Sequence, residues 1–239
     1  MKLPQALENI LFLDIETVPE ATDFGQLNKE AQNLYAAKTA YKRKADDLSA
    51  EDYYDHAGIW AEFGKIVCIS VGYVTSTTDG RQFRVRSFSG DEKELLIEFK
   101  ALLDSHFSAA QHKLCAHNGK EFDFPFMARR MLKHQLELPH VLQLMGKKPW
   151  EVPHLDTLEL WKFGDFKHYT SLKLLAHFFG IPSPKDDMDG SDVARVYYEE
   201  KDLARIVRYC EKDVITLTQV YLKLTLQPPL REDEIVSVS

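Results

Sequence analysis

The chain is poor in cysteine, contains no long apolar run and has no excess of positive charge. Its three cysteines, Cys68, Cys115 and Cys210, share no metal-ligand spacing and lie in apolar stretches, which predicts reduced, buried thiols. Disulfide bonds and a cysteine-based zinc site are therefore not expected. No stretch approaches the length of a membrane span and no secretory signal pattern is present, so we expect a cytoplasmic protein without membrane contacts.

The balance of charges is unusual for a protein that binds nucleic acid. The 239 residues include 30 lysines and arginines against 37 acidic residues, which gives a net charge of -7. Binding to phosphates normally requires clustered basic side chains. Short basic runs at residues 42–44, 129–130 and 147–148 could contact a few nucleotides of a single strand, although such runs are more often solvated surface.

Two acidic residues follow a short apolar run near the start of the sequence. Residues 10–13 are typical of a strand buried on both faces, and Asp14 comes where that strand emerges. Side chains two apart on a strand share a face. Asp14 and Glu16 can therefore point into the same space if the strand continues through Thr17.

Further polar groups lie far downstream. Asp123 follows an apolar run at residues 114–116 and a turn-prone pair, where a strand is expected to give way to a helix. Active sites of open α/β sheets collect at such strand ends. Apolar residues recur at three- and four-residue spacing over residues 201–224, which predicts a long amphipathic helix. Tyr209 and Asp213 are four apart on it and share one face, about 6 Å apart along the axis.

Each of these groups also has an ordinary structural explanation. Asp14 and Glu16 could be strand-end and turn residues, and Asp123 could cap the following helix. Tyr209 could belong to the core and Asp213 to a solvated face. None of these explanations accounts for three motifs in order, each in a fitting secondary structure. We therefore favour one shared site, in which divalent cations offset the repulsion between the carboxylates.

The three motifs resemble those of the DEDD superfamily of 3′-5′ exonucleases, in its tyrosine-containing branch. The most similar members are the proofreading-type exonuclease domains of family B DNA polymerases, and the resemblance spans about residues 8 to 224. The segment SLKLLAHFFGIP, followed by MDGSDV, is similar to a stand-alone bacterial branch of the family. The motif residues are Asp14, Glu16, Thr17, Asn118, Phe122, Asp123, Tyr209 and Asp213.

The resemblance implies a ribonuclease H-like α/β fold, with a mixed five-stranded sheet flanked by helices. It also implies a phosphodiester hydrolase that degrades single-stranded nucleic acid from the 3′ end, with DNA the expected substrate, and releases nucleoside 5′-monophosphates. Two divalent cations, Mg²⁺ or Mn²⁺, would clamp an in-line displacement. The expected catalytic residues are Asp14, Glu16, Asp123, Tyr209 and Asp213, of which the four acidic ones would hold the metal.

The same resemblance assigns finer roles. Tyr209 would orient the attacking water, because a phenol with a pKa near 10 is a poor base at neutral pH. Glu16 and the backbone near Thr17 would meet the terminal 3′-hydroxyl, and Asn118 would lie beside the scissile nucleotide. Phe122 and His168 are further expected substrate contacts.

Two alternatives stay open at this point. The chain could be a catalytically silent module of the same fold that binds nucleic acid or a protein. It could also be an RNA-trimming 3′-5′ exoribonuclease, since no residue can be shown to read the 2′-hydroxyl. Crowded carboxylates argue against the silent module, because a protein without catalysis has no need to keep like charges together.

We expect residues 1–239 to form a single exonuclease domain with an insertion and a tail. Residues from about 21 to 61 are rich in helix formers and predict a helical insertion that could overhang the site. Residues 66–74 and 81–88 are typical of a β-hairpin. Residues from about 227 to 239 contain paired prolines and several acidic groups, which indicates a peripheral tail.

Overall fold

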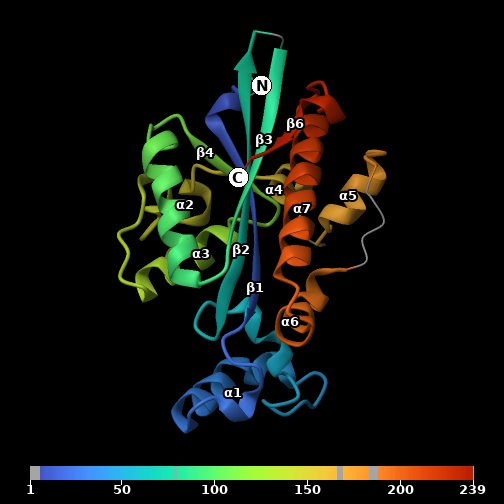
Figure 1. Ribbon diagram of the computed structural model, residues 1–239. Helices are drawn as coiled ribbons and strands as arrows, with labels where there is room; N and C mark the ends of the chain where they lie inside the picture. Colours follow the sequence, from blue (N-terminus) through green and yellow to red (C-terminus); the bar gives the residue numbers. More distant parts are fainter. Residues whose placement is uncertain (1–5, 79, 166–168, 183–187, 239) are drawn as a thin grey trace.

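A mixed sheet forms the centre of the computed structural model, which describes residues 6–78, 80–165, 169–182 and 188–238. Within these ranges the sheet has six strands in the order β5-β4-β1-β2-β3-β6, and helices cover both faces (Figure 1). This α/β arrangement agrees with the expected class and has one strand more than the five expected. The strands are β1 (Ile10–Pro19), β2 (Gly64–Thr77), β3 (Gly80–Ser89), β4 (Lys113–Ala116), β5 (Leu155–Asp156) and β6 (Ile235–Ser237).

Strand β1 is the centre of this sheet. It runs parallel to β4 and antiparallel to β2, and β2 and β3 form the expected hairpin. Leu11 and Leu13 pack into the cluster that includes α2 and α3, whereas Ile10 and Phe12 pack into the cluster that includes α7. All four are fully buried, so β1 is covered on both faces as its continuous apolar run predicts.

The helices form layers on either side of the sheet, with α2 and α3 on one face and α7 on the other (Figure 1). Asp91 caps α2, Ser171 caps α5 and Asp202 caps α7, each by accepting a hydrogen bond from a backbone amide of the first turn. The helices are α1 (Lys29–Arg43), α2 (Glu92–His106), α3 (Asp123–Lys133), α4 (Thr157–Lys162), α5 (Leu172–Phe178), α6 (Val193–Arg195) and α7 (Leu203–Leu224).

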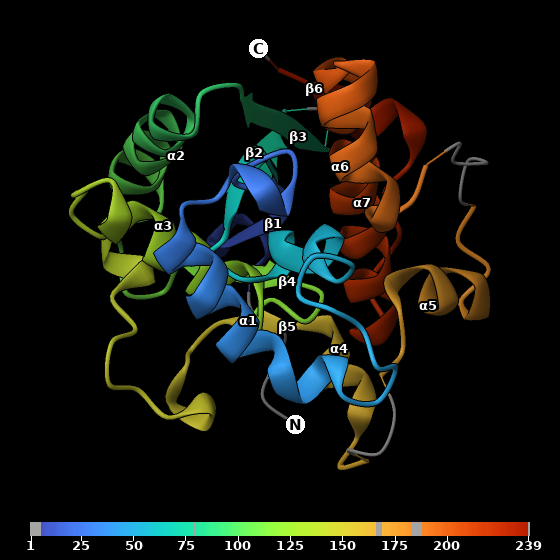
Figure 2. The same ribbon diagram turned by 90° about the horizontal axis from the view of Figure 1, so that it is seen from below.

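The segment between β1 and β2 contains α1 and a 3-10 turn at Tyr54–Ile59, held by a small aromatic cluster of its own. Tyr35 is fully buried there, and its ring lies 5.3 Å from that of Tyr54 and 5.1 Å from that of Phe63. Figures 1 and 2 place α1 beyond the end of β1, on the side where β4 also ends.

The C-terminal segment extends the sheet at its far edge. Strand β6 pairs in parallel with β3, and Glu234 forms an ion pair with Arg81 at 3.1 Å. Leu230 is 6% exposed and packs with the residues under α7. This segment therefore supplies the sixth strand of the sheet.

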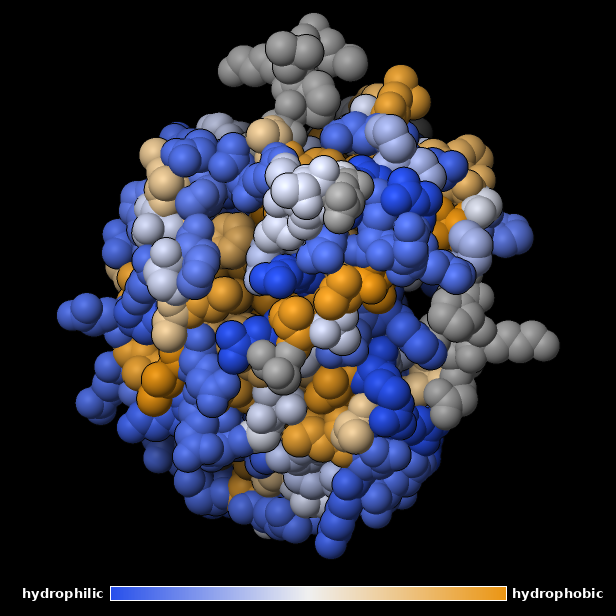
Figure 3. Space-filling view, turned by 45° about the horizontal axis from the view of Figure 1, so that its top comes forward, coloured by the Kyte–Doolittle hydropathy of each residue, from blue (hydrophilic) through white to orange (hydrophobic). Residues whose placement is uncertain are grey.

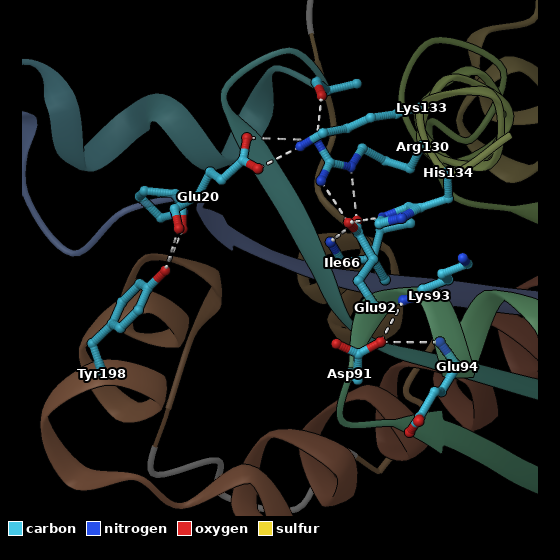
Figure 4. Close-up of polar contacts among 12 residues, drawn as sticks. Glu20, Ile66, Asp91, Glu92, Lys93, Glu94, Arg130, Lys133, His134 and Tyr198 are labelled. Atoms are coloured by element: carbon cyan, nitrogen blue, oxygen red, sulfur yellow. Dashed lines mark hydrogen bonds and ion pairs between the residues drawn. The ribbon is translucent and has the colours of Figure 1, made fainter. Parts of the chain in front are cut away.

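A buried ion pair joins α2, α3 and β2 (Figure 4). Glu92 accepts hydrogen bonds from the Ile66 amide at 2.8 Å, from Arg130 Nε at 2.7 Å and from His134 Nε2 at 2.7 Å. Arg130 is 1% exposed and also donates to the carbonyl of Ala61 at 2.9 Å. The ion pair of Glu92 and Arg130 therefore joins α2, α3, β2 and the segment at Ala61.

These contacts correct the expectation for two of the short basic runs. Arg130 is enclosed by the protein and cannot contact a nucleic acid strand, whereas its neighbour Arg129 is exposed. Arg43 is committed to the Thr39 hydroxyl and to the Ala36 and Leu48 carbonyls. Arg130 is therefore removed from the surface, whereas Arg43 stays partly exposed with its guanidinium held by local acceptors.

The surface is mostly hydrophilic, with apolar side chains in patches near the middle of the face in Figure 3. Among the described residues, none of the helices has both the length and the apolar character that crossing a membrane requires.

Candidate functional site

Strand β1 carries the first two carboxylates of the site. Phe12 is the last residue of β1 that pairs with β4, so Asp14 lies just beyond the point where β4 ends. Asp14 and Glu16 continue the row of side chains that faces α7. A register shift between Glu16 and Thr17 forms a bulge, a feature that commonly aims side chains at the edges of sheets.

Asp123 is the first residue of α3, and the loop before it has a defined shape. Asn118 adopts a left-handed backbone with φ of 63°. The buried carboxylate of Asp156, at the end of β5, accepts from the Asn118 amide at 3.0 Å and from the Lys120 amide at 3.1 Å. The Ile15 amide of β1 donates to the Asp123 carboxylate, so α3 is held with this end directed at β1.

Helix α7 supplies the remaining expected groups. Its buried face includes Ile206, Cys210 and Val214. Tyr209 and Asp213 lie on the neighbouring face, one turn apart, and their side chains are hydrogen-bonded to each other. The phenol therefore donates to the carboxylate and lies against the sheet end that carries Asp14.

The structure brings the five side chains from β1, α3 and α7 together. Asp14 interacts electrostatically with Glu16, Asp123 and Asp213, and Tyr209 interacts with Asp213, Glu16 and Asp14. Glu16 is 7% and Asp123 is 3% exposed, so these two carboxylates are largely shielded from water, whereas Asp14, Tyr209 and Asp213 are half-buried. The predicted convergence of three distant sequence motifs is therefore present in the fold.

Burial and mutual repulsion control the protonation of these groups. Burial raises the pKa of Asp14 well above its usual value, and the charges of Glu16, Asp123 and Asp213 raise it further. The pKa of Glu16 is raised by burial first and by Asp213 second. Burial also raises the pKa of Tyr209, so its phenol keeps its proton at neutral pH.

The donor set fits a divalent cation. No described residue donates a hydrogen bond to the Glu16 carboxylate, although this side chain is more than nine-tenths buried. A buried carboxylate without a donor is costly unless a cation compensates its charge. Carboxylate oxygens are the ligands that Mg²⁺ and Mn²⁺ prefer, and Asp14 and Glu16 each have an oxygen within 4.8 Å of the other, so this pair suits such an ion.

A cavity of about 380 Å³ opens beside these carboxylates and is lined in part by Asp14, Tyr209 and Asp213. Tyr169 and Lys173, which flank the start of α5, line its outer part. A phenol ring and an ammonium group are suited to contacting a base and a phosphate. The cavity thus leads from the surface to the acidic cluster.

Residues 59–235 match the profile of a family described as predicted 3′-5′ exonucleases related to the exonuclease domain of PolB. The chain belongs to this family. The matched range contains Asp123, Tyr209 and Asp213, whereas Asp14 and Glu16 precede it.

The fold of this exonuclease-family chain is similar to that of the family B DNA polymerase from the hyperthermophilic archaeon Pyrobaculum calidifontis. The TM-score is 0.55 at 15% sequence identity, over 91% of this chain and 24% of the polymerase chain. The chain therefore spans about a quarter of that polymerase, and the likeness concerns the fold. It confirms the ribonuclease H-like class. No curated protein matches the chain.

The expected substrate contacts of the exonuclease-family chain lie at different places. Thr17 is half-buried in β1 beside the bulge, and Asn118 is half-buried in the loop before α3. Phe122 precedes α3, and its ring packs 5.4 Å from that of Phe126. His168 lies outside the described residues.

Sequence reasoning missed Asp156, which lies beside this site. Asp156 holds the loop before α3 and also caps α4, through the Leu158 amide at 2.9 Å. Its partners are about 40 residues away in the sequence, and only the aspartate just before a helix could have indicated the cap. His117 lines the cavity with both ring nitrogens engaged, by the Thr157 hydroxyl and the Thr170 carbonyl. Burial lowers its pKa, so His117 is a neutral structural group.

The acidic cluster predicts an unusual dependence of stability on pH. Burial raises the pKa of Asp123 to about 7, and the charge of Asp156 contributes. An aspartate in the unfolded chain has a pKa near 3.9. Between pH values of about 3.9 and about 7, the folded protein therefore binds more protons than the unfolded chain. In EDTA, the free energy of unfolding should therefore contain a component that falls as pH rises through this window. Urea unfolding should show a weaker fall in Asp123→Asn, and identical pH profiles would contradict the assignment.

Proposed function

We propose that the chain is a metal-dependent 3′-5′ exonuclease that hydrolyses phosphodiester bonds at the 3′ end of single-stranded nucleic acid, with DNA the expected substrate. The observation that carries the proposal is the gathering of Asp14, Glu16, Asp123, Tyr209 and Asp213 at one cavity, in a member of an exonuclease family. The products would be nucleoside 5′-monophosphates.

The four carboxylates would hold two cations between them, according to their positions. Asp14, Glu16 and Asp213 would hold one cation, and Asp14 with Asp123 would hold a second. Two such ions, when bound, would lower the pKa of the attacking water and stabilise the departing 3′ oxygen. The protein fixes the four carboxylates on β1, α3 and α7, which are rigid elements, so little reorganisation is needed when substrate binds.

The outer part of the cavity suits the 3′ end of a nucleic acid strand. Tyr169 is 65% exposed, and its ring lies 6.1 Å from that of His117, which is itself fixed by two hydrogen bonds. A base could stack on this tyrosine while Lys173 meets the adjacent phosphate. Because such contacts are few, the affinity for nucleic acid would be modest and would depend strongly on the salt concentration.

Tyr209 should act by positioning the attacking water and not as a base. Its raised pKa and its hydrogen bond to Asp213 keep the phenol protonated. Tyr209→Phe should therefore lower the hydrolysis rate by about 10²-fold, which is the lower end of the range for groups in general acid–base catalysis. Mn²⁺ affinity, measured by calorimetry, should change little, because no carboxylate is removed. Tyr221→Phe on the same helix, outside the cavity, is the matched control; equal rates for both variants would contradict the role.

Digestion of end-labelled oligonucleotides tests the proposal directly. DNA and RNA labelled at the 3′ or 5′ end should be incubated with Mg²⁺, Mn²⁺ or EDTA. Release of monophosphates from the 3′ end that stops in EDTA supports an exonuclease, and faster release from RNA would identify an exoribonuclease. Oligonucleotides that are bound but stay intact under every condition would favour the catalytically silent module.

A further inference from the structure

A groove lies along α3, apart from the acidic cluster, and is called the α3 groove below. Its volume is about 490 Å³, against about 380 Å³ for the cavity beside the carboxylates, and no described residue lines both. One wall is the face of α3 that contains Ala128 and Leu132, and the other wall is formed by residues 138–152. Figures 1 and 2 show α3 and α5, whose start flanks the cavity, on opposite sides of the sheet. The α3 groove is therefore a separate place on the molecule.

The walls of the α3 groove are mainly apolar and partly open to solvent. Leu132 is 48% exposed and Met145 is 81% exposed, and the nearby Trp150 is 76% exposed. Exposed apolar side chains that gather within a charged rim mark an interaction surface more often than isolated ones do. Methionine, tryptophan and arginine are also residue types that protein interfaces favour. The composition of these walls therefore indicates a surface that binds another molecule.

The charges around the α3 groove favour an acidic partner. Lys120 and Glu159 neutralise each other in an ion pair at 2.6 Å. The other charged residues of the lining are Arg129, Lys147 and Glu121. Arg129 and Lys147 are exposed, and neither forms an ion pair with a described residue. Because the whole chain has a net charge of -7, an excess of cations at this place is the opposite of its average.

We propose that the α3 groove binds a short segment of a partner protein, in which large apolar side chains alternate with acidic ones. The apolar side chains of that segment would enter between α3 and residues 138–152, as in other peptide-binding grooves. Its carboxylates would meet Arg129 and Lys147, which provides the complementary charge. Lys148, whose ammonium lies 5.4 Å from the centre of the Trp150 ring, adds a further cation next to this pair.

A nucleic acid strand fits the α3 groove less well than such a peptide. Bases stack on flat aromatic rings, whereas these walls consist mainly of leucine, methionine, proline and valine side chains. Glu121 and Glu159 in the lining would also repel phosphates. The inference is independent of the proposed function, because peptide binding at the α3 groove requires none of the residues assigned to hydrolysis.

Selection from a random peptide library tests the class of partner. A displayed library is enriched on the immobilised full-length protein and then depleted on its Leu132→Asp variant. The peptides that remain should combine leucine, isoleucine, phenylalanine or tryptophan with aspartate or glutamate. Failure to obtain any peptide that distinguishes the wild type from Leu132→Asp would overturn the proposal, and so would enrichment of basic peptides.

Fluorescence anisotropy with the most enriched peptide measures the contribution of each wall. Leu132→Asp should weaken binding at least about tenfold, because it places a charge among the apolar side chains. The double variant Arg129→Glu/Lys147→Glu should also weaken binding at least about tenfold, because it reverses the attraction to the acidic side chains. Unchanged affinity in either variant would contradict the assignment.

The control variants change the same residue types elsewhere on the surface. Ile97→Asp on α2, where the isoleucine is 46% exposed, and Arg84→Glu/Lys93→Glu should keep the affinity of the wild type. Thermal unfolding should show that every variant is folded. Displacement of the peptide by single-stranded DNA would assign the α3 groove to nucleic acid and overturn the proposal. A dimer in sedimentation that Leu132→Asp dissociates would assign it to a second copy of the chain, with the same consequence.

Discussion

Asp14→Asn is expected to lower the rate of 3′-end hydrolysis by at least about 10³-fold, or about 4 kcal/mol of transition-state stabilisation. Asp14 is the carboxylate that interacts with Glu16, Asp123 and Asp213 alike, and it also lines the cavity. An asparagine has almost the same shape but carries no charge, so it cannot bridge two cations. Single-turnover digestion of a labelled oligonucleotide measures the loss, and Asp104→Asn on the surface of α2 is the control.

The same variant should be more stable than the wild type when metal is absent. Burial and three neighbouring carboxylates raise the pKa of Asp14, which means that its charged form destabilises the folded state at neutral pH. The asparagine removes that repulsion. Urea unfolding in EDTA should show a higher free energy of unfolding for Asp14→Asn, and saturating Mg²⁺ should stabilise only the wild type strongly. An inactive variant that is also less stable in EDTA would indicate a merely structural aspartate.

Arg130→Met should lower the free energy of unfolding by about 3 to 5 kcal/mol, the cost of breaking a buried ion pair by removing one partner. Burial alone would raise the pKa of Glu92, but hydrogen bonds from Arg130, His134 and the Ile66 amide outweigh burial and lower it. Methionine fills the space of the aliphatic stem but leaves the carboxylate with fewer donors. Urea denaturation measures the change.

Arg129→Met is the matched control for this prediction. Arg129 is adjacent in α3 but exposed, so its replacement should change the unfolding free energy by no more than about 0.5 kcal/mol. In Glu92→Gln the buried charge is already absent, so adding Arg130→Met to that variant should cost less than in the wild type. Equal costs in the two backgrounds would show that Glu92 and Arg130 are not coupled.

Local periodicity in the sequence predicted much of this fold. The 3.6-residue pattern at residues 201–224 corresponds to α7 at Leu203–Leu224, and the alternating segments at 66–74 and 81–88 correspond to β2 and β3. These patterns reflect contacts between neighbouring turns or adjacent strands. They could be interpreted without knowledge of the whole chain, and they placed Tyr209 and Asp213 on one helix face.

The features that sequence did not indicate depend on distant partners. Arg130 is adjacent to Arg129 in a basic run, yet it is buried because Glu92, 38 residues earlier, lies opposite. Asp156 lies near Asp123 because β5 pairs with β4. Cys210 was expected to be a packing residue, and only the crossing of α7 over β1 brings its sulfur to Asp14. Neither periodicity nor composition encodes such pairings.

Strand β1 lies between β4 and β2, but the similarity to the family profile begins only at residue 59. A shorter polypeptide starting there would keep the hairpin, α2 and α7. It would divide the sheet into two unconnected pieces, β5 with β4 and β2 with β3 and β6, exposing the apolar sides of both. The limits of the family profile and the limits of the sheet therefore differ in this protein, and expression trials should respect the second.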